Sequence, residues 1–493
     1  MTDGARRPPG TAYCRAVVRT VRPGGGAHVT VGPGFTAARL PALRQPAARP
    51  RGDWQRRPGR LVVGGFALAV LLGTGLLLLP AAHTDGTTIS PLAALFTATS
   101  AVCVTGLVVV DTGTAWSGFG QVVILALIQV GGFGIMTLAT LLGLLLSRRL
   151  DLRSRLTAAV ATRSDGLGDV RTVLLGAGVI TILTQTGVAL VLVARQVLTY
   201  GADLGDATWW GVFHATSAFN NAGFGLAADS LVQYQADPWV CLPLVLAVLV
   251  GGIGFPVLLE LFRTRRRASR WSLHTRITLV MTAVLVPVGT LAVLAGEWGN
   301  PGTLGPMPVS EKLLNALVHG VMPRTAGFNS LDMASLDEGT LLTTDVLMFI
   351  GGGSAGTAGG IKMTTFAVLL AVIWAELRGD PDVTVFDRRI TPTSQRQALA
   401  VALLGVALVM VPTIVMSTTS DFGVSDILFE VVSAFATVGL STGITAQLDG
   451  THQLMLVALM FVGRLGPITF GTALALRERR RLFRHPEGAP LVG

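Results

Sequence analysis

Four three-residue segments that end in glycine are the residues of this 493-residue chain best suited to chemistry. They close four copies of one phrase, which align without a gap: FTATSAVCVTGL at 96–107, FHATSAFNNAGF at 213–224, LVHGVMPRTAGF at 317–328 and FEVVSAFATVGL at 429–440. Glycine at the eleventh position tolerates positive φ, so carbonyl groups can turn toward a common axis. Stacked carbonyl rings can replace the hydration shell of a potassium ion. We therefore predict K⁺, and no other metal ion, at four filter segments: Val104, Thr105, Gly106, Asn221, Ala222, Gly223, Thr325, Ala326, Gly327, Thr437, Val438 and Gly439.

A short helix is expected before each filter segment. It covers about eight residues, or about 12 Å, and is too short to cross about 30 Å of hydrocarbon. Unpaired carbonyl groups give its C-terminal end partial negative charge, so four converging ends would favour a cation. As an alternative, the glycines only permit close helix packing, but four aligned copies favour the filter.

The segments that return after each phrase contain a second set of candidates. They read VGGFG at 130–134, VGGIG at 250–254, IGGGS at 350–354 and VGRLG at 462–466. The third continues into a glycine-rich stretch in which a helix should not persist. Broken helices at mid-membrane are a usual site of transport function, so we predict a gating loop at 351–362; a flexible packing joint is the alternative. Its candidate residues are Gly351, Gly352, Gly353, Gly356, Gly359, Gly360 and Lys362.

Arg464 occupies the position at which the other three returning segments have glycine. A charge inside a membrane span is costly and usually functional or paired. The symmetry of the repeats predicts that Arg464 faces the pore axis below the filter, against the loop; a pair with a buried acid is the alternative. Lys362 would either anchor the loop on the cytoplasmic side or add to the barrier.

Apolar helices must position these segments, which predicts an all-α membrane protein. The chain is 51% hydrophobic and 13% charged, against about 25% charged residues in soluble domains. Two spans flank each phrase, giving four fused span–pore-helix–span repeats in a pseudo-fourfold arrangement around one ion pore. The expected spans are 61–80, 121–146, 173–197, 239–262, 277–295, 341–377, 398–416 and 454–476.

The same pattern predicts the division of the chain. We expect a disordered basic cytoplasmic tail at 1–57, repeat 1 at 58–150, repeat 2 at 151–265, repeat 3 with the gating loop at 266–378, repeat 4 at 379–485, and a C-terminal tail at 486–493. Arginines gather in the tail and in alternate loops. By the positive-inside rule both termini are cytoplasmic, and the four phrases enter the plasma membrane from outside.

The phrases resemble the bacterial Trk/Ktr potassium-uptake superfamily, through PRTAGF at 323–328, ATVGLSTGIT at 436–445 and GGGSAGTAGGIK at 351–362. The eight-span count is closer to the KtrB-like members than to the TrkH-like members, which carry extra N-terminal spans. The resemblance covers roughly 60–485. It implies four fused units resembling potassium-channel subunits, a mobile intramembrane loop, and an arginine at Arg464 that contacts this loop. It also implies a homodimer and a cytoplasmic ring of RCK-type regulatory subunits. A nucleotide would act only by binding to these subunits.

Other polar residues carry less weight. Glu430 can stabilise the positive N-terminal end of its short helix, and Arg324 is expected to brace filter segment three by hydrogen bonding. Asp111 and Asp332 follow filter segments and should raise the cation concentration at the mouth. His214 aligns with no other histidine of the four phrases, which argues against a histidine metal site.

Potassium uptake is the leading hypothesis. The alternative is a sodium-coupled or less selective cation secondary transporter, which would normally need an intramembrane carboxylate. Sodium dependence stays open. The sequence offers no nucleophile–base pair, covalently bound cofactor or dinucleotide motif, so we do not expect an enzyme. The partners expected are the bilayer, a second copy and the regulatory ring, not nucleic acid.

Overall fold

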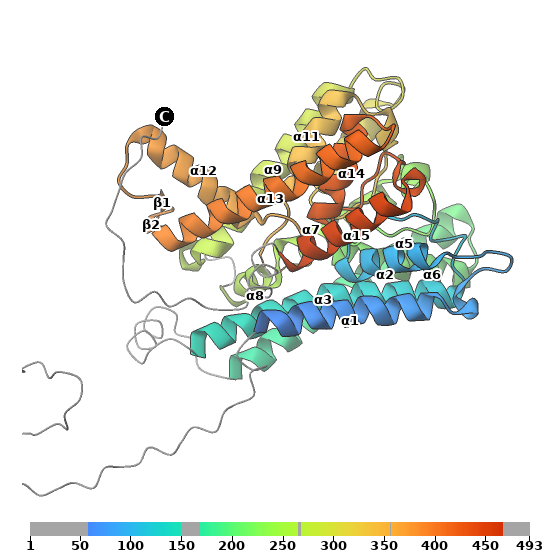
Figure 1. Cartoon of the computed structure of the whole chain (residues 1–493), viewed down its shortest axis with the longest axis horizontal. Helices are drawn as coiled ribbons and strands as arrows, with labels where there is room; N and C mark the ends of the chain where they lie inside the picture. Colours follow the sequence, from blue (N-terminus) through green and yellow to red (C-terminus); the bar gives the residue numbers. More distant parts are fainter. Residues whose placement is uncertain (1–57, 149–167, 265–267, 355, 467–493) are drawn as a thin grey trace, which may run out of the picture. The chain divides into compact units, whose positions relative to one another are not determined.

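The computed structural model describes residues 58–148, 168–264, 268–354 and 356–466. The predicted tails at 1–57 and 486–493 lie outside these ranges. The described part is almost entirely helical, as expected (Figure 1). Its longer helices are α1 (Pro58–Leu77), α2 (Pro91–Cys103), α3 (Gly118–Arg148), α5 (Gly168–Tyr200), α6 (Leu204–Asn220), α7 (Pro238–Ile253), α8 (Phe255–Thr264), α9 (Leu273–Glu297), α10 (Val309–Val321), α11 (Glu338–Phe349), α12 (Met363–Arg378), α13 (Pro392–Thr419), α14 (Val424–Ala436) and α15 (Gly450–Leu465).

Short elements complete the described part. The 3₁₀ turns are η2 (Pro80–Ala82), η3 (Val232–Tyr234), η4 (Ala268–Arg270), η5 (Met333–Ser335) and η6 (Thr445–Gln447). Strands β1 (Thr384–Val385) and β2 (Arg388–Arg389) form an antiparallel hairpin between α12 and α13, in which Thr384 pairs with Arg389 and Val385 pairs with Arg388.

Helix packing follows the four repeats. In each repeat the first helix packs on the second and on the third: α1 on α2 and α3, α5 on α6 and α7, α9 on α10 and α11, and α13 on α14 and α15. The third helix of each repeat also packs on the middle helix of the next: α3 on α6, α7 on α10, α11 on α14, and α15 back on α2. The contact between α15 and α2 joins repeat 4 to repeat 1, so the contacts between successive repeats form a closed circle.

Two of the short middle helices begin at a residue whose side chain caps the helix. α2 starts after Ser90, whose hydroxyl accepts a hydrogen bond from the amide of Ala93, and Pro91 takes the first helical position. α6 starts after Asp203, whose carboxylate accepts from the amide of Gly205. Such side chains satisfy amide groups that lack a partner within the helix.

Within the described residues, the returning helices of repeats 2 and 3 are broken. A loop separates α11 from α12, as the glycine-rich sequence predicted. The segment expected to span at 239–262 is bent, because α7 and α8 meet at an angle of 93°. Gly254 lies between them with φ +99° and ψ 139°, outside the helical region. Pro256 then removes one amide donor, so the ladder of helix hydrogen bonds cannot continue across the junction.

Three described helices are long and apolar enough to cross a membrane: residues 175–200 of α5, all of α9 and all of α13. The bent pair α7 and α8 makes a fourth if it counts as one span. Their apolar side chains are largely exposed, including Leu183, Leu291 and Leu403, as expected of surfaces that face lipid. The predicted count of eight spans stays a prediction.

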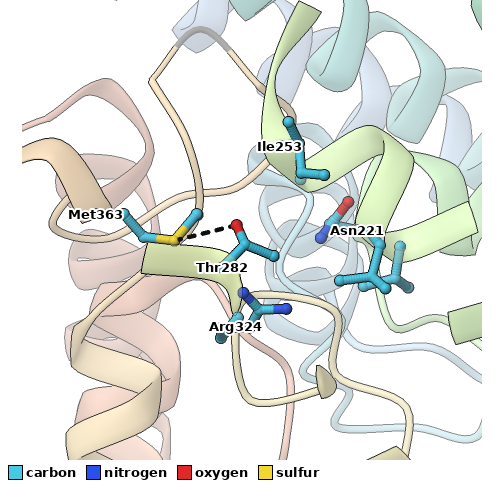
Figure 2. Close-up of a pocket in the computed structure, with 9 residues that line it drawn as sticks. Asn221, Ile253, Thr282, Arg324 and Met363 are labelled. Carbon is cyan, nitrogen blue, oxygen red and sulfur yellow. Dashed lines mark hydrogen bonds between the residues drawn. The ribbon is translucent and has the colours of Figure 1, made fainter. Parts of the chain in front are cut away.

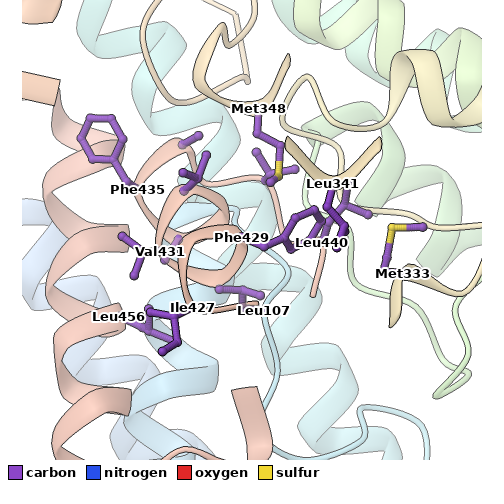
Figure 3. Close-up of a cluster of buried hydrophobic side chains, with 14 of the residues drawn as sticks. Leu107, Met333, Leu341, Met348, Ile427, Phe429, Val431, Phe435, Leu440 and Leu456 are labelled. Carbon is purple, nitrogen blue, oxygen red and sulfur yellow. The ribbon is translucent and has the colours of Figure 1, made fainter. Parts of the chain in front are cut away.

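The largest buried apolar cluster surrounds the fourth short helix. Phe429 and Phe435 of α14 lie among Leu341 and Met348 of α11 and Leu456 of α15 (Figure 3). Leu107 and Leu440, which follow the first and fourth filter glycines, belong to the same cluster. The core therefore reaches the ends of two filter segments and holds their backbone in place.

Candidate cation pathway

The four filter segments share one backbone conformation. Their first residues all have positive φ although none is glycine: 57° at Val104, 58° at Asn221, 72° at Thr325 and 50° at Thr437. The four glycines follow two residues later with φ values of 94°, 68°, 70° and 98° in chain order. A β-branched residue in this region is strained, and such strain concentrates at functional sites. The positive φ of the glycines was predicted, but the left-handed first residue was not.

Hydrogen bonds from the short helices fix this conformation. The amides of Thr105, Ala222 and Val438 donate to carbonyl oxygens one turn back in the preceding helix, each at 2.8 Å. The hydroxyl oxygens of Ser100 and Ser433 accept from the amides of Gly106 and Gly439, at 3.0 and 3.1 Å. These bonds consume N–H groups and leave the segment carbonyls available as ligands.

The four glycines contact one another in a closed ring. A Cβ added to each would meet a carbonyl oxygen of the next segment, at 2.3 Å from Gly106 to Ala222, 3.0 Å from Gly223 to Ala326, 2.2 Å from Gly327 to Val438 and 2.2 Å from Gly439 to Thr105. At Gly106, Gly327 and Gly439 an added Cβ would collide with backbone, so these three positions of the ring require glycine. Residues from four distant parts of the chain thus converge at one point.

A cavity of about 570 Å³ opens on one side of this ring. All four filter glycines line it, and so do the carboxylate-bearing residues Asp111, Asp229 and Asp332. Asp111 and Asp332 were predicted at the mouth, whereas Asp229 was not. Three acidic residues therefore line the same cavity as the four glycines.

The glycine-rich loop lies against the first residues of filter segments two and four. Its two ends pair, since the amide of Gly351 donates to the carbonyl of Ile361 at 2.8 Å. The amide of Gly353 donates to the carbonyl of Gly252 at 2.8 Å. A Cβ added to Gly359 would lie 1.9 Å from the Thr437 hydroxyl oxygen, so the loop touches the first residue of filter segment four. Gly356 and Gly360 also lie within the loop, close to backbone of Gly251 and Ala436.

Arg464 binds the loop directly. Its guanidinium is buried and donates to the carbonyl of Thr357 and, at 3.3 Å, to the carbonyl of Gly131 in repeat 1. No ion pair to an acid is found for it within the described residues, so the contacts match the predicted approach to the loop. Lys362 donates to the carbonyls of Ala358 and Gly359 and thereby ties the end of the loop to its own middle.

The returning segments show where the fourfold pattern breaks. Gly131, Gly251 and Gly463 each pack on the carbonyl of the seventh residue of their own phrase, where an added Cβ would lie 2.0, 1.9 and 1.8 Å away. Gly351 is the equivalent in repeat 3, but its added Cβ would meet the carbonyl of Gly359 at 2.3 Å. The loop therefore takes the place that the phrase holds in the other repeats.

Glu430 has a role that sequence reasoning missed. Its buried carboxylate accepts from the Ser441 hydroxyl at 2.5 Å, the Thr442 amide at 3.1 Å and the Thr445 hydroxyl at 2.5 Å. It therefore clamps the segment after filter glycine four instead of interacting with the start of α14, because residue 430 lies in the middle of that helix. The motif ST-x-x-T that follows the filter was the available signal.

Glu430→Ala is expected to destabilise the protein by about 3 kcal/mol, because it leaves buried hydroxyl and amide groups without an acceptor. Thermal unfolding in detergent would measure the loss. Glu430→Gln should lose less, and Glu338→Ala, an exposed acid at the start of α11, is the control. Equal unfolding temperatures for Glu430→Ala and the wild type would contradict the clamp.

Arg324 does not brace its filter segment by a side-chain hydrogen bond in the described structure. Its buried Nε has no partner there, and its side chain lines a small cavity of about 10 Å³ with Asn221, Thr282 and Met363 (Figure 2). The Nδ1–H of His214 donates a hydrogen bond to the carbonyl oxygen of Trp210 at 2.8 Å. The described residues contain no group of three side chains able to hold a metal ion.

Comparisons with known proteins agree with this geometry. Residues 68–483 match the sequence model of a family described as TrkH, cation transport protein. The chain is 41% identical to Ktr system potassium uptake protein B of Bacillus subtilis, over 89% of this chain and 98% of that one. It is 33% identical to the potassium/sodium uptake protein NtpJ of Enterococcus hirae, over 88% and 97%.

A solved structure supports the fold. The crystal structure of the potassium transporter TrkH from Vibrio parahaemolyticus superposes with a TM-score of 0.68, at 18% identity and over 87% of each chain. The family match over 68–483 and the relative at 41% identity confirm the predicted superfamily, and with it the expectation that the chain is a transporter and not an enzyme.

Proposed function

The chain belongs to the TrkH family of cation transport proteins, and we propose that it carries potassium ions into the cell through a pore at the centre of its four repeats. The ring of Gly106, Gly223, Gly327 and Gly439 carries this proposal. A cation there is surrounded by carbonyl groups from four sides, and such groups can replace its hydration shell. The proposed arrangement is pseudo-fourfold, with K⁺ bound at the four filter segments.

Discrimination against sodium should be moderate. Each filter segment contributes one glycine with positive φ, and its first residue brings an unlike side chain in each repeat: Val104, Asn221, Thr325 and Thr437. Potassium selectivity depends on the number of coordinating carbonyl groups and on the field strength of their dipoles. A short filter supplies few ordered ion sites, and we therefore expect moderate selectivity. The inward-negative potential contributes about 2.3 kcal/mol per charge per 100 mV, which suffices for downhill uptake.

The loop at 351–362 is the proposed gate. Its glycines pack on filter segment four, and Arg464 and Lys362 hold it by its carbonyl groups. A buried guanidinium near the pore axis also opposes a passing cation. Opening then requires the loop to leave these partners.

The setting follows from the family and remains a proposal. We place the protein in the plasma membrane with both termini in the cytoplasm, as a homodimer that binds a ring of RCK-type regulatory subunits. Nucleotide would act only through that ring.

Rubidium uptake into proteoliposomes tests the function. Liposomes loaded with potassium and containing the purified protein should accumulate ⁸⁶Rb⁺, whereas protein-free liposomes should not. Absence of flux with the regulatory subunits also present would refute the proposal.

A less selective or sodium-coupled transporter is the second candidate, because NtpJ is named as a potassium/sodium uptake protein. A voltage-clamped bilayer separates the two. Uncoupled conduction gives a reversal potential that follows the potassium gradient, and coupling shifts that potential whenever the sodium gradient changes.

Asp111→Asn combined with Asp332→Asn is expected to lower the apparent affinity for external potassium by about twofold per charge at low ionic strength. The carboxylates line the entrance and concentrate cations there. The half-saturating Rb⁺ concentration would be measured at about 10 and 150 mM of an impermeant salt. Screening should abolish the difference at high salt, and an equal difference at both salts would contradict steering.

A further inference from the structure

Asn221 differs from its equivalents in the other filter segments, because within the described residues it is the one whose side chain forms a hydrogen bond with the gating loop. Val104, Thr325 and Thr437 occupy the same position in the other phrases. The Asn221 amide oxygen accepts a hydrogen bond from the Thr357 hydroxyl at 2.8 Å. Both residues are almost fully buried, at 1% and 0% exposure, so water does not compete for this bond.

Thr357 connects the loop to repeats 2 and 4. Its hydroxyl also approaches the carbonyl of Phe219 at 3.4 Å, and its amide donates to the carbonyl of Gly251 at 3.3 Å. Its own carbonyl accepts from Arg464. One residue of the gate therefore contacts the end of α6, the returning helix of repeat 2 and the arginine of repeat 4.

The bond acts on the residue that orients filter segment two. Asn221 has φ 58° and ψ 48° and caps α6, and the next two residues are Ala222 and Gly223 of the ring. The Asn221 amide nitrogen has no hydrogen-bond partner in the described structure and lines the small cavity that Met363 and Gly352 also line (Figure 2). When Thr357 moves away, the amide oxygen of Asn221 loses its hydrogen-bond donor, and the side chain has room to rotate.

We propose that the hydrogen bond between Thr357 and Asn221 couples the gate to the filter, so that a residue outside the filter sets its ion selectivity. The inference rests on the proposed potassium pathway. The loop also packs on Thr437, so it braces filter segments two and four, which are not neighbours in the ring. Coupling of this kind is reciprocal. An ion that stabilises the conformation that filter segment two has when the loop is closed must therefore also stabilise the closed loop.

Thr357→Val tests the coupling, because valine keeps the shape of threonine but removes the hydroxyl. We expect the ratio of K⁺ to Na⁺ permeability to fall about fivefold, as for the loss of one buried hydrogen bond. Bi-ionic reversal potentials in planar bilayers give this ratio independently of the amount of active protein. Thr357→Ser should retain the wild-type ratio. Thr357→Ala, which also removes the hydroxyl, should show the same fall and replaces the valine variant if that variant does not fold.

The matched control is Ser354→Ala. This hydroxyl lies in the same loop but bonds to the Thr364 hydroxyl at 2.9 Å, so its removal should leave the ratio unchanged even if opening is altered. In an Asn221→Ala background, Thr357→Val should cause no further change in the ratio.

Each contrary result has a separate meaning. An unchanged ratio in Thr357→Val with conserved potassium flux would overturn the coupling while the proposed function stands. Additive changes in the double variant would show that Thr357 does not act through Asn221, and would also overturn it. Absence of potassium flux in the wild type would instead refute the proposed function.

Discussion

Gly439→Ser is expected to lower the selectivity for potassium over sodium by at least about tenfold. The first side-chain atom would lie 2.2 Å from the Thr105 carbonyl oxygen and 3.0 Å from the Cα of Gly106. Real Cβ atoms do not approach backbone so closely, so segment one must move. The φ of 98° is also strained for serine. Displaced carbonyls coordinate the ion from fewer sides, and selectivity depends on their number.

Sodium competition against ⁸⁶Rb⁺ uptake measures this effect. Gly443→Ser is a close control, because Gly443 has a similar φ of 94° but open space around the added atom. It should reproduce the backbone strain without the collision. A selectivity equal to the wild type in Gly439→Ser would contradict the carbonyl filter, whatever its rate of uptake.

Arg464→Gln is expected to raise potassium flux in the absence of any regulatory subunit by at least about tenfold. The substitution removes hydrogen bonds from a charged donor to the carbonyls of Thr357 and Gly131, and each such bond contributes about 1.5–3 kcal/mol. It also removes a positive charge from beside the proposed ion path. Both changes favour the open loop.

Two further variants separate the causes. Arg464→Lys keeps the charge but loses the planar fork that reaches two carbonyls, so an intermediate flux would assign part of the barrier to the charge. Arg378→Gln, at a cation–π contact with Trp374 at the end of α12, is the control. Basal flux that stays at the wild-type level in Arg464→Gln would show that this residue does not hold the gate closed.

The sequence predicted the parts of the fold that repeat. Four glycines in register, each with a short helix before it, were sufficient to anticipate the helical fold and the residues that meet in the ring. The break at 351–362 was also foreseeable, because six glycines in ten residues cannot sustain a helix. Arg464 was identified for the converse reason, since it departs from the repeat.

Other features depend on partners that lie far away in the chain. The partner of Asn221 is 136 residues distant, and no local pattern reports it. Glu430 was assigned to its own helix end because its acceptor role depends on how the chain folds back after the filter. The bend at Gly254 was missed because the apolar pattern continues across it, while one residue with φ +99° changes the direction of the helix.

The closure of the ring by Gly439 on Thr105 has a consequence for biosynthesis. The ribosome makes repeat 1 first and repeat 4 last. Filter segment one therefore lacks its contact with filter segment four while more than three hundred residues are added. Contacts so distant in sequence form late, and incomplete intermediates expose surfaces prone to misassembly. The proposed filter is therefore complete only after filter segment four of repeat 4 has been made.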